Sequence, residues 1–443
     1  MSDWTEMEAI ALGDGIARGE IDPVALTEAY LEKIAAHPLT DRIYARVTPE
    51  RARAEARAAA DRARMGRRRS ALDGVPVSWK DLFDSAGTAT EAGSAMLKGR
   101  VPGRDARVLR EATAAGLVCL GKTHMSELAF SGLGLNPVTA TPPCVNDAGA
   151  VSGGSSSGAA ASVAFGLAPA AIGSDTGGSV RVPSAWNDLV GLKTTAGRVS
   201  LEGVVPLAPR FDTVGPLTKS VADAALLLRL LEGRKAPDLG QAGSLKGRRF
   251  ARLTTIVEED LAPEIARAYE AVLRAFEAAG ATISDVAAPE IEGPMADAGV
   301  LYTGEAWALW GETIEAEGAA MFDPIRARFE GGREVSAAEF LRAWARLEEA
   351  RQAWGARMAG FDAVLCPTTP NLPPDAARLM EDGDYYVAEN LKTLRNTRVG
   401  NLMGLSAVSL PGGTPSAGIS LMGAPWAEER LLSLAASAAR ALG

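Results

Sequence analysis

Histidine is almost absent from this sequence. Among 443 residues there are only two, His37 and His124. A serine nucleophile needs a neighbouring base to take its proton, and histidine is the residue that most often does so. Serine-based chemistry in this chain would therefore depend on one of these two residues or on a base of another kind, and the obvious candidate is a lysine.

Cysteine is also scarce. The chain has three, widely spaced and without a C-x-x-C pair: Cys119, Cys144 and Cys366. This spacing indicates neither a disulfide framework nor a zinc site, and we expect no metal and no cofactor. Small buried thiols in a reducing compartment are the simplest interpretation.

Excess positive charge and long apolar runs are lacking as well. The net charge is −9, which disfavours non-specific binding to nucleic acid. The longest apolar run, 159–173, is too short to cross a membrane and is broken by Gly166 and Pro169. The first residues, M-S-D-W-T-E-M-E, are acidic and unlike a signal peptide. The sequence therefore predicts a cytoplasmic protein with no nucleic-acid or membrane partner.

Helix and strand signals alternate along the chain, which predicts an α/β fold. Residues 105–123 have the pattern of a helix, a glycine stop and a buried strand, and 263–286 repeat that order. Further helices are expected from Pro23, from Pro49, over much of 290–358 and from about Trp426, and further strands at 76–83 and 362–367. We expect one large domain over 1–443, with a mixed central β-sheet covered by helices on both faces.

One motif matches a phosphate-binding loop in letters only. Residues 116–123, G-L-V-C-L-G-K-T, fit the Walker A pattern. Such a loop needs a strand before its first glycine and a helix starting at the lysine, but here a helix precedes Gly116 and the middle of the motif resembles a strand. We therefore reject nucleotide binding at this segment.

A turn rich in glycine supplies the best nucleophile candidate. Residues 175–179 read D-T-G-G-S, and two glycines before a serine let the backbone approach a substrate closely. Successive amides of such a turn can form an anion-binding nest, which is what an oxyanion hole requires. Ser179 is therefore the preferred nucleophile, although a tight turn with a surface serine has the same pattern.

An earlier tract, 153–158, reads G-G-S-S-S-G. Composition alone favours a flexible linker. The tract runs directly into an Ala-rich apolar segment, however, so it also fits a turn at a helix start with amides and hydroxyls facing one site.

Lys80, in G-V-P-V-S-W-K-D, is the candidate base. A lysine that is neutral at pH 7 needs its pKa lowered by roughly 3 units or more, and burial can supply a shift of that size. Its apolar neighbours along the chain suit such a pocket. Two alternatives remain open: Lys80 is a surface residue, or His124 is the base in a Ser179–His124–Asp175 triad.

Several long motifs in order resemble the amidase signature family over nearly the whole chain. They are G-V-P-V-S-W-K-D (74–81), G-K-T-H-M-S-E (121–127), S-G-G-S-S-S-G (152–158), D-T-G-G-S-V-R-V-P (175–183), D-T-V-G-P-L-T-K-S-V-A-D-A (212–224), L-C-P-T-T-P (365–370), R-N-T (395–397) and N-L-M-G-L-S-A-V-S-L-P (401–411). The resemblance implies a signature core at about 70–230 and a variable helical region at about 290–358 that shapes the substrate site.

The resemblance also implies a Ser–cis-Ser–Lys triad. Ser179 corresponds to the acylated nucleophile, Lys80 to the general base and Ser155 to the bridging serine, whose preceding peptide bond is cis in the family. The amides of the oxyanion hole correspond to Thr176, Gly177, Gly178 and Ser179. The implied activity is hydrolysis of a small-molecule amide, or of a related urea or carbamate bond.

The substrate is left open by the sequence. We expect pocket residues around Met125, at 206–211 and in 290–358. Arg210 and Arg181 could each meet a substrate carboxylate, although a structural ion pair is the preferred role for Arg181. The segment 414–420 looks shorter than is usual in the family, with Ser420 where glutamine is common, which puts the substrate's shape in doubt.

One alternative function is that of the amidase component of a tRNA-dependent amidotransferase, which would need partner proteins. The shortened C-terminal region and the lack of basic runs weigh against it. A homodimer is compatible with the sequence, but no feature indicates one.

Overall fold

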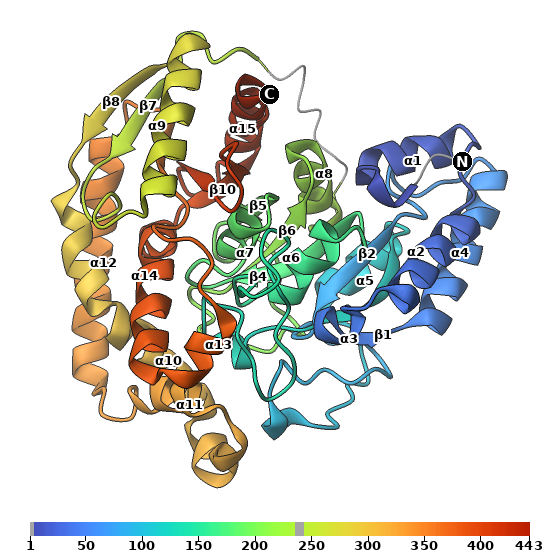
Figure 1. Cartoon of the computed structure of the whole chain (residues 1–443), viewed down its shortest axis with the longest axis horizontal. Helices are drawn as coiled ribbons and strands as arrows, with labels where there is room; N and C mark the ends of the chain where they lie inside the picture. Colours follow the sequence, from blue (N-terminus) through green and yellow to red (C-terminus); the bar gives the residue numbers. More distant parts are fainter. Residues whose placement is uncertain (1–3, 235–242) are drawn as a thin grey trace.

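A mixed β-sheet runs through the computed structural model, which describes residues 4–234 and 243–443. The first three residues of the acidic N-terminal segment lie outside this range. Over the described residues the sheet has 11 strands in the order β1-β3-β2-β4-β6-β5-β10-β11-β9-β7-β8. In Figure 1 it passes from β1 at the right to β7 and β8 at the upper left.

The strands are β1 (Tyr44–Val47), β2 (Pro76–Lys80), β3 (Val118–Thr123), β4 (Ala170–Asp175), β5 (Val190–Lys193), β6 (Thr213–Thr218), β7 (Arg249–Leu253), β8 (Thr282–Val286), β9 (Ala363–Pro367), β10 (Ser406–Pro411) and β11 (Gly418–Gly423). Strand β2 pairs in parallel with β3 and β4, and β7 pairs in parallel with β8 and β9. The other pairs are antiparallel. The mixed sheet predicted from the sequence is confirmed.

The helices are α1 (Ala9–Ala17), α2 (Pro23–Ala36), α3 (Thr40–Ile43), α4 (Pro49–Arg64), α5 (Arg107–Ala114), α6 (Ser157–Ala164), α7 (Arg181–Trp186), α8 (Val221–Leu231), α9 (Pro263–Ala278), α10 (Glu292–Glu317), α11 (Asp323–Glu330), α12 (Ala337–Met358), α13 (Ala376–Glu381), α14 (Gly383–Leu402) and α15 (Glu428–Leu442). Helices cover both faces of the sheet. Helices α8, α9 and α15 form one group, and α6 and α7 contact the central strands in a second group, with α14 packed against α7.

The start of α2 illustrates how the local sequence determines where a helix begins. The Asp22 side chain accepts hydrogen bonds from the amides of Val24 and Ala25 at 2.9 and 3.0 Å, and Pro23 occupies the first turn. Such capping satisfies amides that have no partner inside the helix. The helix expected from Pro23 is confirmed.

Burial increases from the edge of the sheet to its centre. All six residues of β4 are buried, whereas most of the edge strand β8 is exposed or half-exposed. Strands covered on both faces are expected to be apolar or to hold fully partnered polar groups. Lys80 at the end of β2 and Asp175 at the end of β4 are polar residues in fully buried strands, so their hydrogen-bond partners need to be identified.

The Walker-like segment does not form a phosphate loop. Strand β3 continues through Lys122 and Thr123, where a phosphate loop would begin a helix. The buried Lys122 ammonium pairs with Asp81 at 3.2 Å and donates to Thr90 at 3.0 Å. The rejection of this motif as a nucleotide site agrees with the structure.

Candidate active site

Lys80 is the last residue of β2 and is fully buried. Its Nζ donates to Ser155 Oγ at 2.7 Å and to Ser174 Oγ at 2.8 Å. Burial lowers the pKa of Lys80 to about 7, although the charges of Asp175 and Asp212 act to raise it. The lysine is therefore not a surface residue, and a large fraction of it is neutral near pH 7.

The tract that resembled a linker is packed inside the protein. Residues 151–163 are buried, and the tract leads into α6. The Gly154–Ser155 peptide bond is cis, as the resemblance implied. A Cβ on Gly154 would lie 2.5 Å from the amide nitrogen of Gly134, so only glycine fits there. The linker interpretation is wrong, because neighbouring backbone holds the tract in place.

Ser179 ends a turn that follows β4 directly. The amide of Ser156 donates to the Ser179 carbonyl at 3.2 Å, which joins this turn to the Ser155 tract. Gly178 has φ 142°, and a Cβ there would lie 2.2 Å from Thr397 Oγ1. The glycine therefore permits both the backbone conformation and the close approach of α14.

Asp175 organises this turn. Its carboxylate accepts from the Gly178 and Val180 amides, at 2.9 and 3.2 Å, and from the Arg181 guanidinium, at 3.0 Å to each of two nitrogens. Asn401 on α14 donates to it at 2.8 Å. Burial acts to raise the pKa of Asp175, but Arg181, Lys193 and Asn401 together outweigh it, and the pKa falls to about 2. Arg181 is thus the structural ion-pair partner that the sequence favoured.

One amide of the expected oxyanion hole is already used. Because the Gly178 N–H donates to Asp175, it does not face an incoming oxyanion. The N–H groups of Thr176, Gly177 and Ser179 have no acceptor among the described residues. These three amides remain available at the turn.

His124 does not complete a triad with Ser179 and Asp175. The Asp175 carboxylate is occupied by Arg181, and the buried His124 Nδ1 has no partner among the described residues. Burial lowers the pKa of His124 to about 4. The histidine alternative is therefore not supported by the geometry.

Two further polar residues support Lys80 and were missed in the sequence. Ser174 precedes Asp175 in β4 and is the second partner of the Lys80 ammonium. Asp212 accepts from Thr176 Oγ1 at 2.5 Å and raises the pKa of Lys80 by its charge. Both lie inside or beside motifs noted above, but nothing in the spacing alone showed that they face Lys80.

A small, narrow cavity that is partly open to solvent lies beside Ser179. It is lined by Ala129, Phe130, Ser131, Thr176, Gly177, Ser179, Leu207, Tyr302, Arg328, Leu394 and Arg398. Tyr302, Arg328 and Arg398 come from α10, α11 and α14, which contact one another in the lower left of Figure 1. The 290–358 region therefore reaches the cavity, as expected.

Met125 and Arg210, which are expected near the substrate from the sequence, lie outside the described lining of this cavity. Met125 is fully buried, and its carbonyl accepts from Asn136 at 2.7 Å. Arg210 lies over the rings of Phe340 and Trp344, with its guanidinium carbon 5.5 and 5.0 Å from the ring centroids. Neither is among the described residues that line the cavity beside Ser179.

Ser420 also lies away from this cavity. It is a buried residue of β11, and its hydroxyl shares a hydrogen bond with Thr368 at 3.0 Å. The departure from the family pattern at this position is therefore accommodated within the sheet and does not change the described cavity wall.

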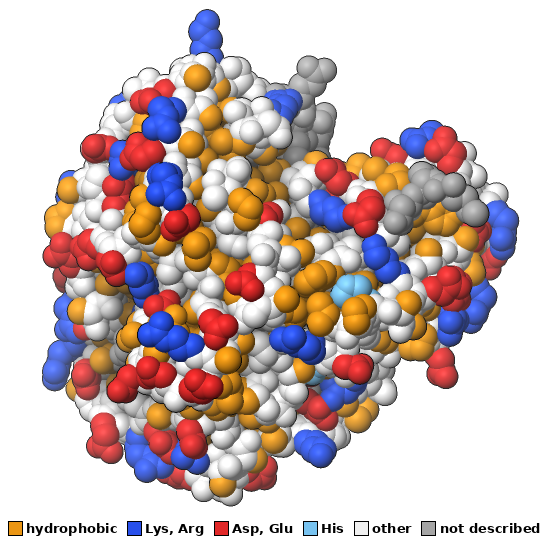
Figure 2. Space-filling view, viewed as in Figure 1, with side chains coloured by type: hydrophobic (Ala, Val, Ile, Leu, Met, Phe, Trp, Pro, Cys, Tyr) orange, Lys and Arg blue, Asp and Glu red, His pale blue; other side chains and the backbone are white. Residues whose placement is uncertain are grey.

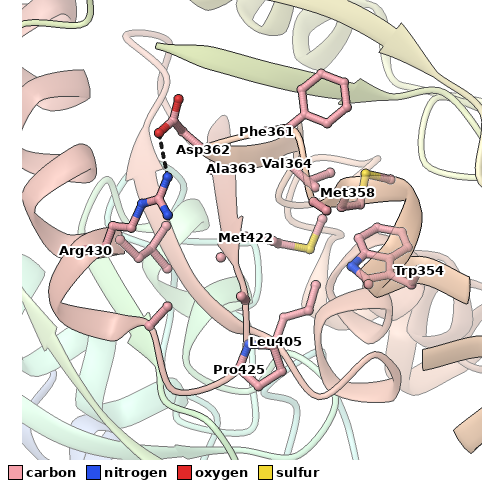
Figure 3. A pocket seen from close by; sticks show the side chains of 16 residues that line it. Trp354, Met358, Phe361, Asp362, Ala363, Val364, Leu405, Met422, Pro425 and Arg430 are labelled. Carbon is pink, nitrogen blue, oxygen red and sulfur yellow. Dashed lines mark hydrogen bonds and ion pairs between the residues drawn. The ribbon is translucent and has the colours of Figure 1, made fainter. Parts of the chain in front are cut away.

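A second pocket lies at the C-terminal end of α12 (Figure 3). Trp354, Met358 and Met422 supply much of its wall, and Asp362 and Arg430 form an ion pair at its edge, at 2.8 Å. None of its described lining residues is a serine, lysine, histidine or cysteine. The pocket therefore lacks a nucleophile–base pair.

The rest of the described chain adds neither a metal site nor a membrane segment. No cluster of three or more potential ligands is found in residues 4–234 and 243–443. No helix within these ranges is long and apolar enough to cross a membrane. On the face drawn in Figure 2, acidic and basic side chains are intermixed.

Comparison with known proteins agrees with the geometry. The amidase family model matches residues 25–432. The glutamyl-tRNA(Gln) amidotransferase A subunit of Anaeromyxobacter dehalogenans is 35% identical, with 97% of this chain and 95% of the relative aligned. The 2-amino-5-chloromuconic acid deaminase of Comamonas testosteroni is also 35% identical, over 95% of this chain and 93% of the relative.

Solved structures give the same result. An amidase crystal structure matches with a TM-score of 0.88 at 30% identity, over 99% of this chain and 100% of that chain. The peptide amidase of Stenotrophomonas maltophilia matches with a TM-score of 0.82 at 26% identity, over 98% and 96%. The sequence, the fold and the relatives together establish that this chain belongs to the amidase signature family of amide-hydrolysing enzymes.

Proposed function

We propose that this enzyme cleaves a small-molecule amide through an acyl-enzyme on Ser179, with Lys80 as general base and Ser155 as relay. The observation that carries the proposal is the buried Lys80, which lies 2.7 Å from Ser155 Oγ and whose pKa is about 7. A base with a pKa near the working pH combines a usable neutral fraction with sufficient proton affinity.

In the proposed cycle, neutral Lys80 takes the hydroxyl proton of Ser155 as Ser155 takes that of Ser179. The Ser179 Oγ attacks the amide carbonyl carbon, and the C–N bond breaks as the relay returns a proton to the leaving amine. Water then attacks the ester, losing a proton to the same relay, and the acid leaves as Ser179 regains its proton.

The amides of Thr176, Gly177 and Ser179 are proposed to hold the developing oxyanion. Preorganised amides contribute most where charge develops in the transition state. Gly178 is proposed to serve the hole indirectly, because its N–H holds the turn to Asp175.

The helical region 290–358 is proposed to shape the substrate site, and the signature core 70–230 to carry the chemistry. Tyr302 on α10 and Arg328 on α11 line the cavity from the helical side. The turn at 175–179 lines it from the sheet side.

A fluorophosphonate probe tests the nucleophile, because it reacts only with an activated serine. We expect the Ser179→Ala variant to lose labelling, measured by intact-protein mass. Ser433→Ala, on α15 outside the cavity lining, is the matched control and should be labelled at the wild-type rate. Labelling of Ser179→Ala at the wild-type rate would exclude Ser179 as the nucleophile.

A second function is favoured by the 35% identity to an amidotransferase component. In that case the chain would act within an assembly on charged tRNA. Size-exclusion chromatography and amide hydrolysis by the purified chain separate the two functions. Hydrolysis by the chain alone supports the free-standing amidase, whereas activity that appears only with partner proteins supports the assembly.

A further inference from the structure

The cavity beside Ser179 carries two positive charges that no carboxylate of the described residues pairs with. Arg328 and Arg398 both line it, and neither has an ion-pair partner among the described residues. Most other buried or half-buried arginines do, for example Arg181 with Asp175 and Arg198 with Glu232. A largely buried guanidinium without a counter-ion is costly unless an anion lies beside it.

Arg398 is the more exceptional of the two. The residue is 9% exposed, and no described residue accepts a hydrogen bond from its guanidinium. Burial lowers its pKa, and nearby Tyr302 partly offsets this. A Cβ built on Gly177 would lie 3.8 Å from Arg398 Cγ. The aliphatic part of the Arg398 side chain therefore lies next to the turn that carries Ser179.

Arg328 is held in place from one side only. One of its nitrogens donates to the Phe130 carbonyl at 3.0 Å, and its guanidinium carbon lies 4.3 Å from the Phe130 ring centroid. Burial and the charge of Arg398 both lower the pKa of Arg328. A guanidinium has five donors and stays charged in proteins, so several remain for a ligand.

A neutral donor completes the group. Tyr302 lines the same cavity, and its buried hydroxyl has no hydrogen-bond partner among the described residues. Its ring is fixed against Phe211, with centroids 4.6 Å apart. Buried hydroxyls are rarely left without a partner, so the missing acceptor is expected to come from a ligand.

Two acidic residues that bind the turn carrying Ser179, Asp175 and Asp212, are already engaged. Asp175 binds Arg181 and Asn401, and Asp212 accepts from Thr176 and from the amides of Leu207 and Ala208. Among the described residues that line the cavity, Arg328, Arg398 and Tyr302 keep unused donors, and two of these three side chains are cationic.

We propose that the substrate is a short amide that carries a carboxylate, and that Arg398, Arg328 and the Tyr302 hydroxyl bind this carboxylate while the amide carbon lies at Ser179. The cavity is small and Arg398 begins beside the Ser179 turn, so few bonds separate the two groups of the substrate. Monoamides of four- and five-carbon dicarboxylic acids have this form. This substrate class rests on the function proposed above.

Matched substrates test the charge without changing the shape. Succinamate and glutaramate each carry an amide and a carboxylate, whereas succinamide and glutaramide replace the carboxylate by a second, neutral amide. Ammonium release by the purified full chain gives kcat/KM for each. We expect the acid amides to be favoured by roughly 10- to 150-fold, the range of a charge-assisted hydrogen bond.

Single substitutions locate the source of that preference. Arg398→Gln and Arg328→Gln should each reduce the preference by at least about tenfold, measured as the ratio of kcat/KM for the acid amide to kcat/KM for the diamide. Arg398→Lys keeps the charge and should restore part of it. Arg326→Gln is the matched control, because Arg326 is on the same helix as Arg328 but pairs with Asp323 on the surface.

Binding to an inactive variant separates this proposal from the function it rests on. Calorimetric titration of Ser179→Ala with succinamate and with succinamide should show tighter binding of the acid amide. Equal binding of both overturns the proposed substrate class, even if amides are hydrolysed. An equal loss of rate for acid amides and diamides in Arg398→Gln also overturns it, since the arginine would then serve the reacting centre. Failure of the wild type to react with any amide or with the fluorophosphonate probe counts against the proposed function, whatever the binding result.

Discussion

The sheet side and the helical side of the cavity treat polar groups in opposite ways. On the sheet side, Lys80, Ser155 and Asp175 are deeply buried and each has protein partners. On the helical side, Arg398 and Tyr302 are also buried but have no hydrogen-bond partner among the described residues. A self-satisfied network suits chemistry common to many amides, whereas unsatisfied donors suit recognition of one kind of substrate.

Removing the general base is the substitution with the largest expected effect on the sheet side. Lys80→Ala should lower kcat/KM by roughly four orders of magnitude, because general-base catalysis contributes about that much at most. His124→Ala is the control and should keep the rate within about threefold, since the geometry gives His124 no part in the triad. Steady-state amide hydrolysis measures both. The reverse pattern would restore the histidine triad.

Breaking the Asp175–Arg181 pair tests the sheet side by stability. Asp175→Asn leaves the Arg181 charge without its counter-ion, and the fully buried pair predicts a loss of about 3–5 kcal/mol in the free energy of unfolding. The matched change on the helical side is Asp297→Asn, which removes the partner of the exposed Arg346. Chemical denaturation should show little change there. Equal losses would mean that the two regions do not differ in this way.

The pH dependence sharpens the assignment of the base. Because burial lowers the pKa of Lys80 to about 7, kcat/KM should be constant above that pH and fall about tenfold per unit below it. The sign follows from the neutral amine being the active form. Rates of fluorophosphonate labelling at pH values on both sides of that pKa measure it without a substrate. An inflection that disappears in His124→Ala would assign the titration to the histidine instead.

The smallest expected effect is on the outer surface of the helical region. Gly355 lies inside α12, and a Cβ built there meets no heavy atom within 4 Å. Gly355→Ala should therefore stabilise the protein by about 0.5–1 kcal/mol, because alanine loses less chain entropy in a helix. Gly178→Ala, at φ 142°, should destabilise it and lower activity. Thermal denaturation distinguishes the two signs.

The sheet side could be predicted from sequence because its residues lie in short motifs. The Gly-Gly pair before Ser179 and the Gly/Ser tract around Ser155 indicate unusual backbone conformations. The scarcity of histidine favours Lys80 as the base. The alternation of helices and strands likewise predicted the mixed sheet, and nearly every expected element is present.

The helical side could not be predicted in the same way. Tyr302, Arg328 and Arg398 are far apart in the chain and meet only because α10, α11 and α14 pack together. Nothing local separates Arg398 from Arg395, which instead donates to the Glu259 carbonyl. The sequence therefore suggested Met125 and Arg210, which lie near motifs but outside the cavity lining.

Asn401 and Thr397 tie α14 to the nucleophile turn, through Asp175 and the Gly177 carbonyl. The helix that carries Arg398 is thus anchored to the reaction centre, whereas Arg328 sits on the short helix α11, which has no such anchor to the turn among the described contacts. For enzyme engineering this makes the two arginines unequal starting points. Grafting a foreign segment over 318–336 would be the tractable route to a new substrate range, while exchange of α14 would disturb the turn that holds Ser179.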